Sequence, residues 1–294
     1  MTEAEGFRES LHPTLIVNCV ANAFLSFSAI VLNVITIQAL RKTPSLSRTL
    51  KTLLLNLTIS DLGVGLLVQP LYVASLVMEN EQNTNNIAFY VVRKAHIIQR
   101  QLFVFGSFSC VFVLTVDRFL AIHLHLRYQE LVTHKRVVAV VVSTWVFRAS
   151  VTFLRQFYLT MGSLPAIIVV VCIITTGLLY CTIYAAVRHH TNQIHVLQVQ
   201  QVAQNGEMPN AARQRKMAVA TFYVYVVYLV CYLPVACIVF AKTNGETVLL
   251  SRLEYFTLTL AYLNSSLNPL IYCWKMRHIR QTVMVILRNI FPSG

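Results

Sequence analysis

The chain has 294 residues, of which 56% are hydrophobic and only 12% are charged. An ordinary soluble domain carries about a quarter charged residues, so this composition excludes that class and indicates an integral membrane protein. The 24 basic residues outnumber the 11 acidic ones. In a soluble protein this excess would suggest nucleic-acid binding, but here the charges lie between apolar runs, so we expect no nucleic-acid partner.

Seven apolar segments are long enough to cross a bilayer as helices. They are expected at residues 15–40, 53–78, 90–123, 137–157, 164–188, 217–240 and 250–274. The preceding tail, residues 1–14, is short and mildly acidic and lacks the features of a signal peptide. The sequence therefore predicts an all-α membrane protein with a seven-transmembrane helix bundle over residues 15–274.

The last segment, residues 275–294, holds apolar side chains at helical spacing among several arginines. This pattern is typical of an amphipathic helix that lies on a membrane surface and contacts its lipids. We therefore expect a short amphipathic eighth helix on the cytosolic face, followed by a very short cytosolic tail.

Lysine and arginine are distributed unevenly between the two sides of the predicted bundle. Sixteen of the 24 lie in the first, third and fifth connections or the C-terminal segment, six lie on the other side and two lie within spans. By the positive-inside rule, the side with sixteen faces the cytosol. The sequence predicts a multi-pass plasma-membrane protein with an extracellular N-terminal tail (1–14) and a cytosolic C-terminus.

The third span carries a polar stripe on an otherwise apolar helix. Arg100 and Arg118 are eighteen residues apart, so they point the same way on a helix that turns about 100° per residue. Ser107 lies within about 20° of that direction, and the two arginines are separated by about 27 Å along the axis. This spacing predicts one charge near each membrane surface and a polar group at mid-depth.

Landmarks on all seven spans resemble one receptor family. They are Asn33, Leu57–Asp61, Asp117-Arg118-Phe119, Trp145, Tyr180, Cys231–Pro234 and Asn268-Pro269-Leu270-Ile271-Tyr272. In this order they resemble the rhodopsin-like (class A) G-protein-coupled receptors. Within that class the chain resembles the melanocortin, lysophospholipid and adenosine receptor cluster. The resemblance implies a receptor that is not an enzyme, requires no cofactor, binds an extracellular ligand and activates a heterotrimeric G protein.

The resemblance also implies an activation switch near the inner membrane surface. Its expected members are Asp117, Arg118, Tyr180, Tyr232, Pro234, Asn268, Pro269 and Tyr272. Arg118 is expected to pair with Asp117 at rest and to turn toward two tyrosines when the sixth helix swings outward. Pro234 removes a backbone donor and kinks that helix. Tyr232 stands where the family usually has tryptophan, which alters the switch beneath the ligand site.

Asp61 is a carboxylate at mid-membrane, where a charge costs about 2.5–3.5 kcal/mol, so it is expected to face partners inside the bundle. Ser107, Asn264 and Asn268 supply polar groups at comparable depth. The resemblance implies an allosteric Na⁺ site at these four residues, and oxygen ligands suit such a hard cation. A water-filled polar cluster with a protonated Asp61 is the alternative.

The predicted ligand site lies in the outer half of the bundle, at Arg100, Gln101, Arg148 and Tyr232. Biogenic-amine receptors carry an aspartate where this chain has Arg100, so electrostatics disfavours a cationic amine. Because buried arginines are costly, an anionic small molecule or lipid is a suitable ligand for them. The alternative is that Arg100 and Arg148 are structural, bonded to helix carbonyls or to the loop acid Glu254.

Three other functions compete with a ligand-activated receptor. A non-signalling decoy and a constitutively active orphan receptor both remain open, because the residues around the switch are altered. A seven-helix transporter is disfavoured, because Asp61 is the only mid-span acid and the chain has no internal repeats. Light sensing through retinal is excluded, because no lysine lies between Lys242 and Lys275.

Overall fold

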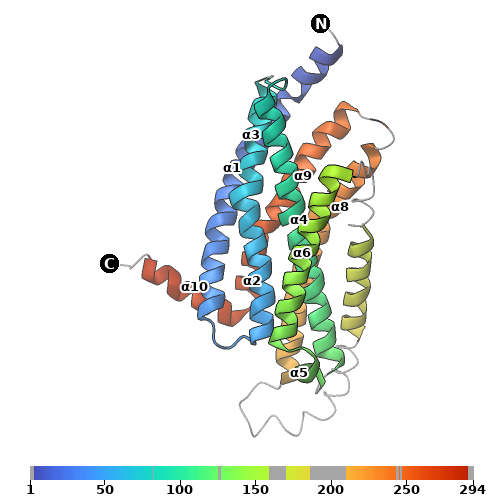
Figure 1. The fold of residues 1–294 in the computed structure, drawn as a ribbon. Helices are drawn as coiled ribbons and strands as arrows, with labels where there is room; N and C mark the ends of the chain where they lie inside the picture. Colours follow the sequence, from blue (N-terminus) through green and yellow to red (C-terminus); the bar gives the residue numbers. More distant parts are fainter. Residues whose placement is uncertain are drawn as a thin grey trace.

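The computed structural model describes residues 3–81, 83–124, 127–158, 170–185, 210–242, 245 and 247–290. Every regular element within these ranges is a helix. Figure 1 shows the long helices running side by side in one elongated bundle, with α10 leaving it at an angle near the C-terminus.

The helices of the described ranges match the predicted spans in order. They are α1 (Glu3–Lys42), α2 (Arg48–Gly63), the π-helix η1 (Val64–Val68), α3 (Gln69–Asn80), α4 (Ile87–His123), α5 (Tyr128–Leu131), α6 (His134–Tyr158), an apolar helix at Val170–Ala185, α8 (Asn210–Ala241), α9 (Val248–Lys275) and α10 (Arg277–Ile290). Within the described ranges, five segments combine the length and hydropathy needed to cross a membrane: Leu11–Lys42, Arg48–Asn80, Ile87–His123, His134–Gln156 and Val219–Ala241. The helix Val170–Ala185 and the 28-residue α9 lie on the other two predicted spans.

α4 lies at the centre of the bundle and packs against α2, α3, α6 and α8, while α9 packs against α1 and α8. Large apolar side chains point outward, as Phe24 on α1 (70% exposed) and Phe147 on α6 (69% exposed) show. Polar side chains, including Asp61 and Asn268, are fully buried. This inside-out distribution suits a bundle whose solvent is lipid.

The second span contains a π-helical turn that the sequence analysis missed. The Gln69 N–H donates to the carbonyl oxygen of Val64, five residues earlier, and α3 continues from there. Pro70 has no N–H and its ring crowds the carbonyl four residues back, which explains a local departure from α-helical bonding. Just before this turn, a Cβ atom on Gly63 would lie 2.2 Å from the Phe103 ring, so α2 and α4 approach closely there.

Hydrogen bonds join α1 to α9 along much of their length. Thr259 on α9 donates to the Asn18 side-chain oxygen at 2.6 Å and accepts from the Asn22 amide at 2.7 Å. Deeper in the bundle, the Asn33 amide donates to the Ser265 carbonyl oxygen at 2.9 Å. We refer to these bonds as the α1–α9 seam. Because lipid offers no competing hydrogen-bond partners, the seam fixes the position of α1 against α9.

The ends of the bundle refine the predicted boundaries. α1 begins at Glu3, so most of the predicted tail (1–14) forms the first turns of this helix. At the other end Met276 has an extended backbone and separates α9 from α10. Ile279 on α10 is buried while Arg280 is exposed, so this helix is amphipathic. Which side of the membrane each end occupies stays a prediction.

Candidate functional site

Asp61 anchors a polar cluster at the middle of the bundle, where α2, α4 and α9 meet. The Ser107 hydroxyl donates to Oδ1 of Asp61 at 3.0 Å, and the Asn268 amide donates to Oδ2 at 2.8 Å. All three residues are fully buried. These two donors satisfy part of the hydrogen-bonding capacity of the carboxylate, which lowers the cost of holding it in an apolar region.

Several polar atoms beside Asp61 lack normal partners. Asn268 Oδ1, the Ser265 hydroxyl and both amide atoms of Asn264 are buried and form no hydrogen bond of normal geometry with described residues. Buried polar atoms are nearly always bonded to protein, water or an ion. An oxygen-rich group of this kind fits a hard cation such as Na⁺. Asn264 does not bond to Asp61, and Ser265 is a neighbour that the sequence analysis did not include.

The C-terminal end of α4, predicted to face the cytosol, carries an ion pair. Arg118 Nε donates to Oδ2 of Asp117 at 3.0 Å, and Nη2 of the same arginine also pairs with this oxygen. Arg118 is 3% exposed and Asp117 is 5% exposed. The arginine therefore lies folded against its neighbour and is shielded from solvent.

Tyr128 on the short helix α5 completes this ion pair, and sequence reasoning missed it. Its hydroxyl donates to Oδ1 of Asp117 at 2.7 Å, so the carboxylate is held by Arg118 on one oxygen and by Tyr128 on the other. Burial, and secondarily the negative charge of Asp117, raises the pKa of Tyr128 to about 12. At neutral pH the hydroxyl is therefore protonated and available as a donor.

The two tyrosines expected to receive Arg118 have other surroundings in this conformation. The Tyr180 ring stacks on Tyr225 with centroids 5.1 Å apart, and its hydroxyl accepts a hydrogen bond from Thr115 at 3.2 Å. The Tyr272 hydroxyl is buried without a hydrogen-bond partner among the described residues. Arg118 thus pairs with Asp117 while Tyr180 is bonded elsewhere.

The remaining switch residues lie on α8 and α9. Tyr232 stacks on Tyr228 with centroids 4.1 Å apart and an interplanar angle of 15°. Tyr232 also lies beside Asn264 and within electrostatic range of Asp61. Pro234 and Pro269 fall inside helices that continue past them. Tyr232 therefore connects the sixth predicted span to the Asp61 cluster.

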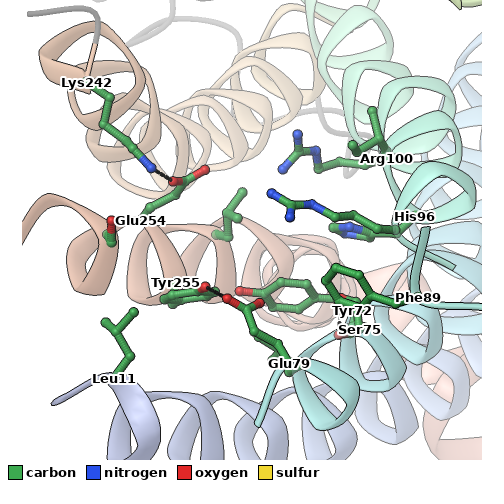
Figure 2. Close-up of a pocket in the computed structure, with 15 residues that line it drawn as sticks. Leu11, Tyr72, Ser75, Glu79, Phe89, His96, Arg100, Lys242, Glu254 and Tyr255 are labelled. Carbon is green, nitrogen blue, oxygen red and sulfur yellow. Dashed lines mark hydrogen bonds and ion pairs between the residues drawn. The ribbon is translucent and has the colours of Figure 1, made fainter. Parts of the chain in front are cut away.

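A cavity of about 240 Å³, which we call the outer pocket, opens at the opposite end of the bundle (Figure 2). Its walls come from α1, α3, α4 and α9, together with Lys242 after α8. Five charged side chains line it: Glu79, Arg93, Arg100, Lys242 and Glu254. The pocket therefore combines both signs of charge within a small volume.

Hydrogen bonds fix several walls of the outer pocket. Lys242 Nζ lies 2.6 Å from Glu254 Oε2, and the Tyr255 hydroxyl donates to Glu79 Oε1 at 2.6 Å, as the dashed lines in Figure 2 show. His96 Nε2 lies 2.8 Å from the Tyr262 hydroxyl, and both residues are buried. These contacts hold α3, α4 and α9 in a defined arrangement around the cavity.

The structure brings only part of the predicted ligand set to this pocket. Arg100 lines it, whereas Gln101, Arg148 and Tyr232 do not. Arg148 Nε donates to the Thr144 carbonyl oxygen at 3.0 Å and its guanidinium lies 4.1 Å from the Trp145 ring centre. This arrangement agrees with the alternative in which Arg148 is a structural residue bonded to a helix carbonyl.

Other pocket residues were missed or placed differently by the sequence analysis. Glu254 lies within α9, not in a loop, and pairs with Lys242. Glu79, Arg93 and His96 were not included in the predicted site. A signal for Arg93 existed, because it lies seven residues before Arg100 and therefore on the same side of the helix. Glu79 and Lys242 carry no such signal, because the fold alone brings them together.

A membrane-crossing helical bundle with an Asp–Arg pair at one end and a charged pocket at the other defines a seven-helix membrane receptor. The family model described as "7 transmembrane receptor (rhodopsin family)" matches residues 32–166 and 154–272, so the chain belongs to this family. The match confirms the predicted resemblance and the seven-helix fold. It also confirms that the chain is a receptor and not an enzyme.

The curated relatives are distant receptors of the same class. The chain is 23% identical to "Adenosine receptor A3" of Canis lupus familiaris over 296 residues, which cover 90% of this chain and 88% of the relative. It is 24% identical to "Melanocortin receptor 5" of Bos taurus over 245 residues, which cover 75% of this chain and 73% of the relative. Both belong to the receptor cluster that the sequence resembles.

Proposed function

We propose that the chain is a plasma-membrane receptor that binds an extracellular ligand and promotes nucleotide exchange on a heterotrimeric G protein. The observation that supports this proposal best is the Asp117–Arg118 ion pair, at the end of α4 opposite the outer pocket. Tyr128 donates a hydrogen bond to the Asp117 carboxylate of this pair. In this proposal the N-terminus is extracellular and the C-terminus is cytosolic. The amphipathic helix α10 then lies on the inner leaflet, with its exposed arginines near lipid headgroups.

The ligand in this proposal is anionic and contacts Arg100 in the outer pocket. Arg100 forms no ion pair with an acid in the part of the chain that the structure describes. A guanidinium offers paired donors that match carboxylate or phosphate oxygens. An incoming anion would therefore find a charge partner at Arg100 that the protein itself does not supply.

Na⁺ acts as an allosteric ion in this proposal, held by Asp61, Ser107, Asn264 and Asn268. The polar atoms without partners beside Asp61 support it, because they leave oxygens available inside the bundle. The cation would offset the carboxylate charge and hold α2, α4 and α9 together. Its presence would thereby favour the conformation in which Arg118 stays paired with Asp117.

The experiment measures cyclic AMP and calcium in cells that express wild type, Arg118→Ala or Asp61→Asn without added ligand. A basal signal that falls in Arg118→Ala supports G-protein coupling. A loss of sodium dependence in Asp61→Asn supports the ion site. Surface staining of each variant controls for expression.

A non-signalling decoy is the second candidate, favoured by the stacked Tyr228–Tyr232 pair on α8, where the family usually has phenylalanine and tryptophan. This pair changes the packing beneath the outer pocket, where ligand binding must be relayed to the inner end. A constitutively active orphan receptor would instead show a large basal signal. If wild type matches empty cells and a G protein added to purified receptor exchanges no nucleotide, two functions remain: a quiet receptor that awaits its ligand, and the decoy.

A further inference from the structure

The charges of the outer pocket are divided between its walls. Arg93 and Arg100 come from α4, and Glu79 comes from α3. Lys242 and Glu254 offset each other as an ion pair at 2.6 Å. The charges that remain are two cations on one wall and one anion on another.

Arg93 and Arg100 both line the outer pocket from α4. They are seven residues apart, which places them two turns apart on one side of α4, with Ile97 between them. Both lie within electrostatic range of His96, and neither forms an ion pair with an acid in the described ranges. Because the two guanidinium groups repel each other, an anion placed between them is stabilised by both.

Glu79 retains capacity for a further partner. One of its oxygens, Oε1, accepts the Tyr255 hydroxyl, while Oε2 has no hydrogen-bond partner among the residues that the structure describes. The side chain is only partly buried, and it lines the cavity. A cationic group of a bound molecule can therefore approach Glu79 while the arginines hold an anionic group.

The size and polarity of the outer pocket restrict the ligand further. Ten of the fifteen lining residues have polar or charged side chains, whereas binding pockets are usually lined mostly by apolar ones. A lipid tail would have to desolvate many of these groups without bonding to them, which is unfavourable. A volume of about 240 Å³ suits a molecule of amino-acid to nucleoside size.

We propose that the outer pocket binds a small zwitterion. Its carboxylate or phosphate lies between Arg93 and Arg100, and its amino group faces Glu79. This inference rests on the proposed function, because it names the ligand class of the same receptor site. The inference narrows the ligand class from any anionic small molecule or lipid to a compact molecule that carries both a negative and a positive charge.

The test measures the polarity of the pocket directly and needs no known ligand. Two variants each place one thiol in the pocket. Ile97→Cys places it between the two arginines, and Ser75→Cys places it one turn before Glu79. Each purified receptor reacts with methanethiosulfonates that carry either a sulfonate or a trimethylammonium group. The rate of each reagent with the receptor is divided by the rate of the same reagent with a free thiol. Mass spectrometry of the labelled peptides separates these positions from the native cysteines.

We expect opposite preferences at the two positions. Ile97→Cys should react about tenfold faster with the sulfonate, and Ser75→Cys about threefold faster with the ammonium reagent. Adding Arg93→Gln and Arg100→Gln should abolish the first preference, and adding Glu79→Gln should abolish the second. Lys94→Gln is the matched control, because Lys94 lies over the Tyr90 ring and does not line the pocket.

A preference for the sulfonate at both positions would overturn the zwitterion in favour of a purely anionic ligand. No preference at either position, or preferences that survive the glutamine substitutions, would overturn it as well. If Ile97→Cys does not fold, Phe89→Cys offers another pocket position on α4. The reactions contain no G protein, so a failure of coupling and a failure of this inference are read separately.

Discussion

Arg100 and Arg118 lie on the same side of α4, yet the structure surrounds them differently. Arg118 is almost completely buried and is bonded to Asp117, which in turn is bonded to Tyr128. Arg100 is only partly buried, faces a cavity and has no acid partner among the residues that the structure describes. Arg118 has an acid partner within the protein, whereas in the proposed function Arg100 takes its acid partner from a ligand. In the proposed function, this contrast corresponds to a closed switch at one end of α4 and an open ligand site at the other.

Asp117→Asn should have the largest effect on the contrast between the two ends of α4. Loss of this carboxylate charge leaves Arg118 buried without its partner, and breaking such a pair costs about 3–5 kcal/mol. The conformation with a closed switch loses most of this free energy, so basal second-messenger output should rise at least tenfold. The control is Glu130→Gln, which removes an exposed acid on α5. An unchanged basal signal with normal surface expression would contradict the closed-switch interpretation.

Tyr128→Phe should produce a smaller change in the same direction. The substitution removes one hydrogen bond to a charged acceptor, which is worth about 1.5–3 kcal/mol. Basal output should therefore rise, but less than in Asp117→Asn, and the two changes together should not exceed the larger one. This non-additivity would show that both residues act through one contact. Fully additive effects would argue that Tyr128 acts elsewhere.

The pH dependence of the Tyr128 contact sharpens this prediction. The pKa of Tyr128 is raised to about 12, above its ordinary value. A raised pKa means that the contribution to folding is fully present below about pH 10 and is lost as the pH rises through about 12. The difference in thermal midpoint between wild type and Tyr128→Phe should therefore be constant between pH 6 and 9. A difference that disappears within that range would rule out this donor role.

At the outer end, removing one hydrogen bond should have a modest effect. Tyr255→Phe deletes the partly buried donor to Glu79, which we expect to lower the free energy of unfolding by about 1 kcal/mol. Thermal unfolding of the purified receptor measures this change. The exposed Tyr90→Phe, also near this end of the bundle, is the control. A loss as large as that in Asp117→Asn would contradict the contrast between the two ends.

The smallest effect is expected for the ion pair at the rim of the outer pocket. The side chains of Lys242 and Glu254 are 23% and 32% exposed, so water and salt screen their attraction. A double-mutant cycle with Lys242→Gln and Glu254→Gln should give a coupling below about 1 kcal/mol in thermal unfolding. A coupling of several kcal/mol would mean that this pair is a structural element comparable to Asp117–Arg118.

The sequence predicts the bundle well, because long apolar runs in a bilayer leave the helix as the available structure. It predicts less about contacts between helices. Arg93 was recoverable from its spacing to Arg100, whereas the contact between Tyr128 and Asp117 depends on the position of the short helix α5 near the end of α4. The π-helical turn before α3 also escaped, since a proline such as Pro70 signals a departure from regular bonding without specifying its form.

Arg148 shows a second limit of sequence reasoning. A charged residue on an apolar helix suggests a functional site, and its depth alone does not distinguish a ligand contact from an internal one. Here the neighbouring Trp145 ring and the Thr144 carbonyl oxygen occupy part of the guanidinium surface. These two partners lie three and four residues back on the same helix, but only the side-chain conformation of Arg148 selects them.

The α1–α9 seam has a consequence for how the receptor can be cut and rebuilt. It connects the first long helix to the last through side chains that find no substitute partner in lipid. A receptor expressed as two polypeptides, divided in the short turn between α1 and α2, should therefore reassemble in the membrane. Replacing Asn18, Asn22 and Asn33 with leucine should leave each piece inserted but separate. In that respect the first helix would behave as a detachable subunit, which α9 binds through these hydrogen bonds while α3 packs against it.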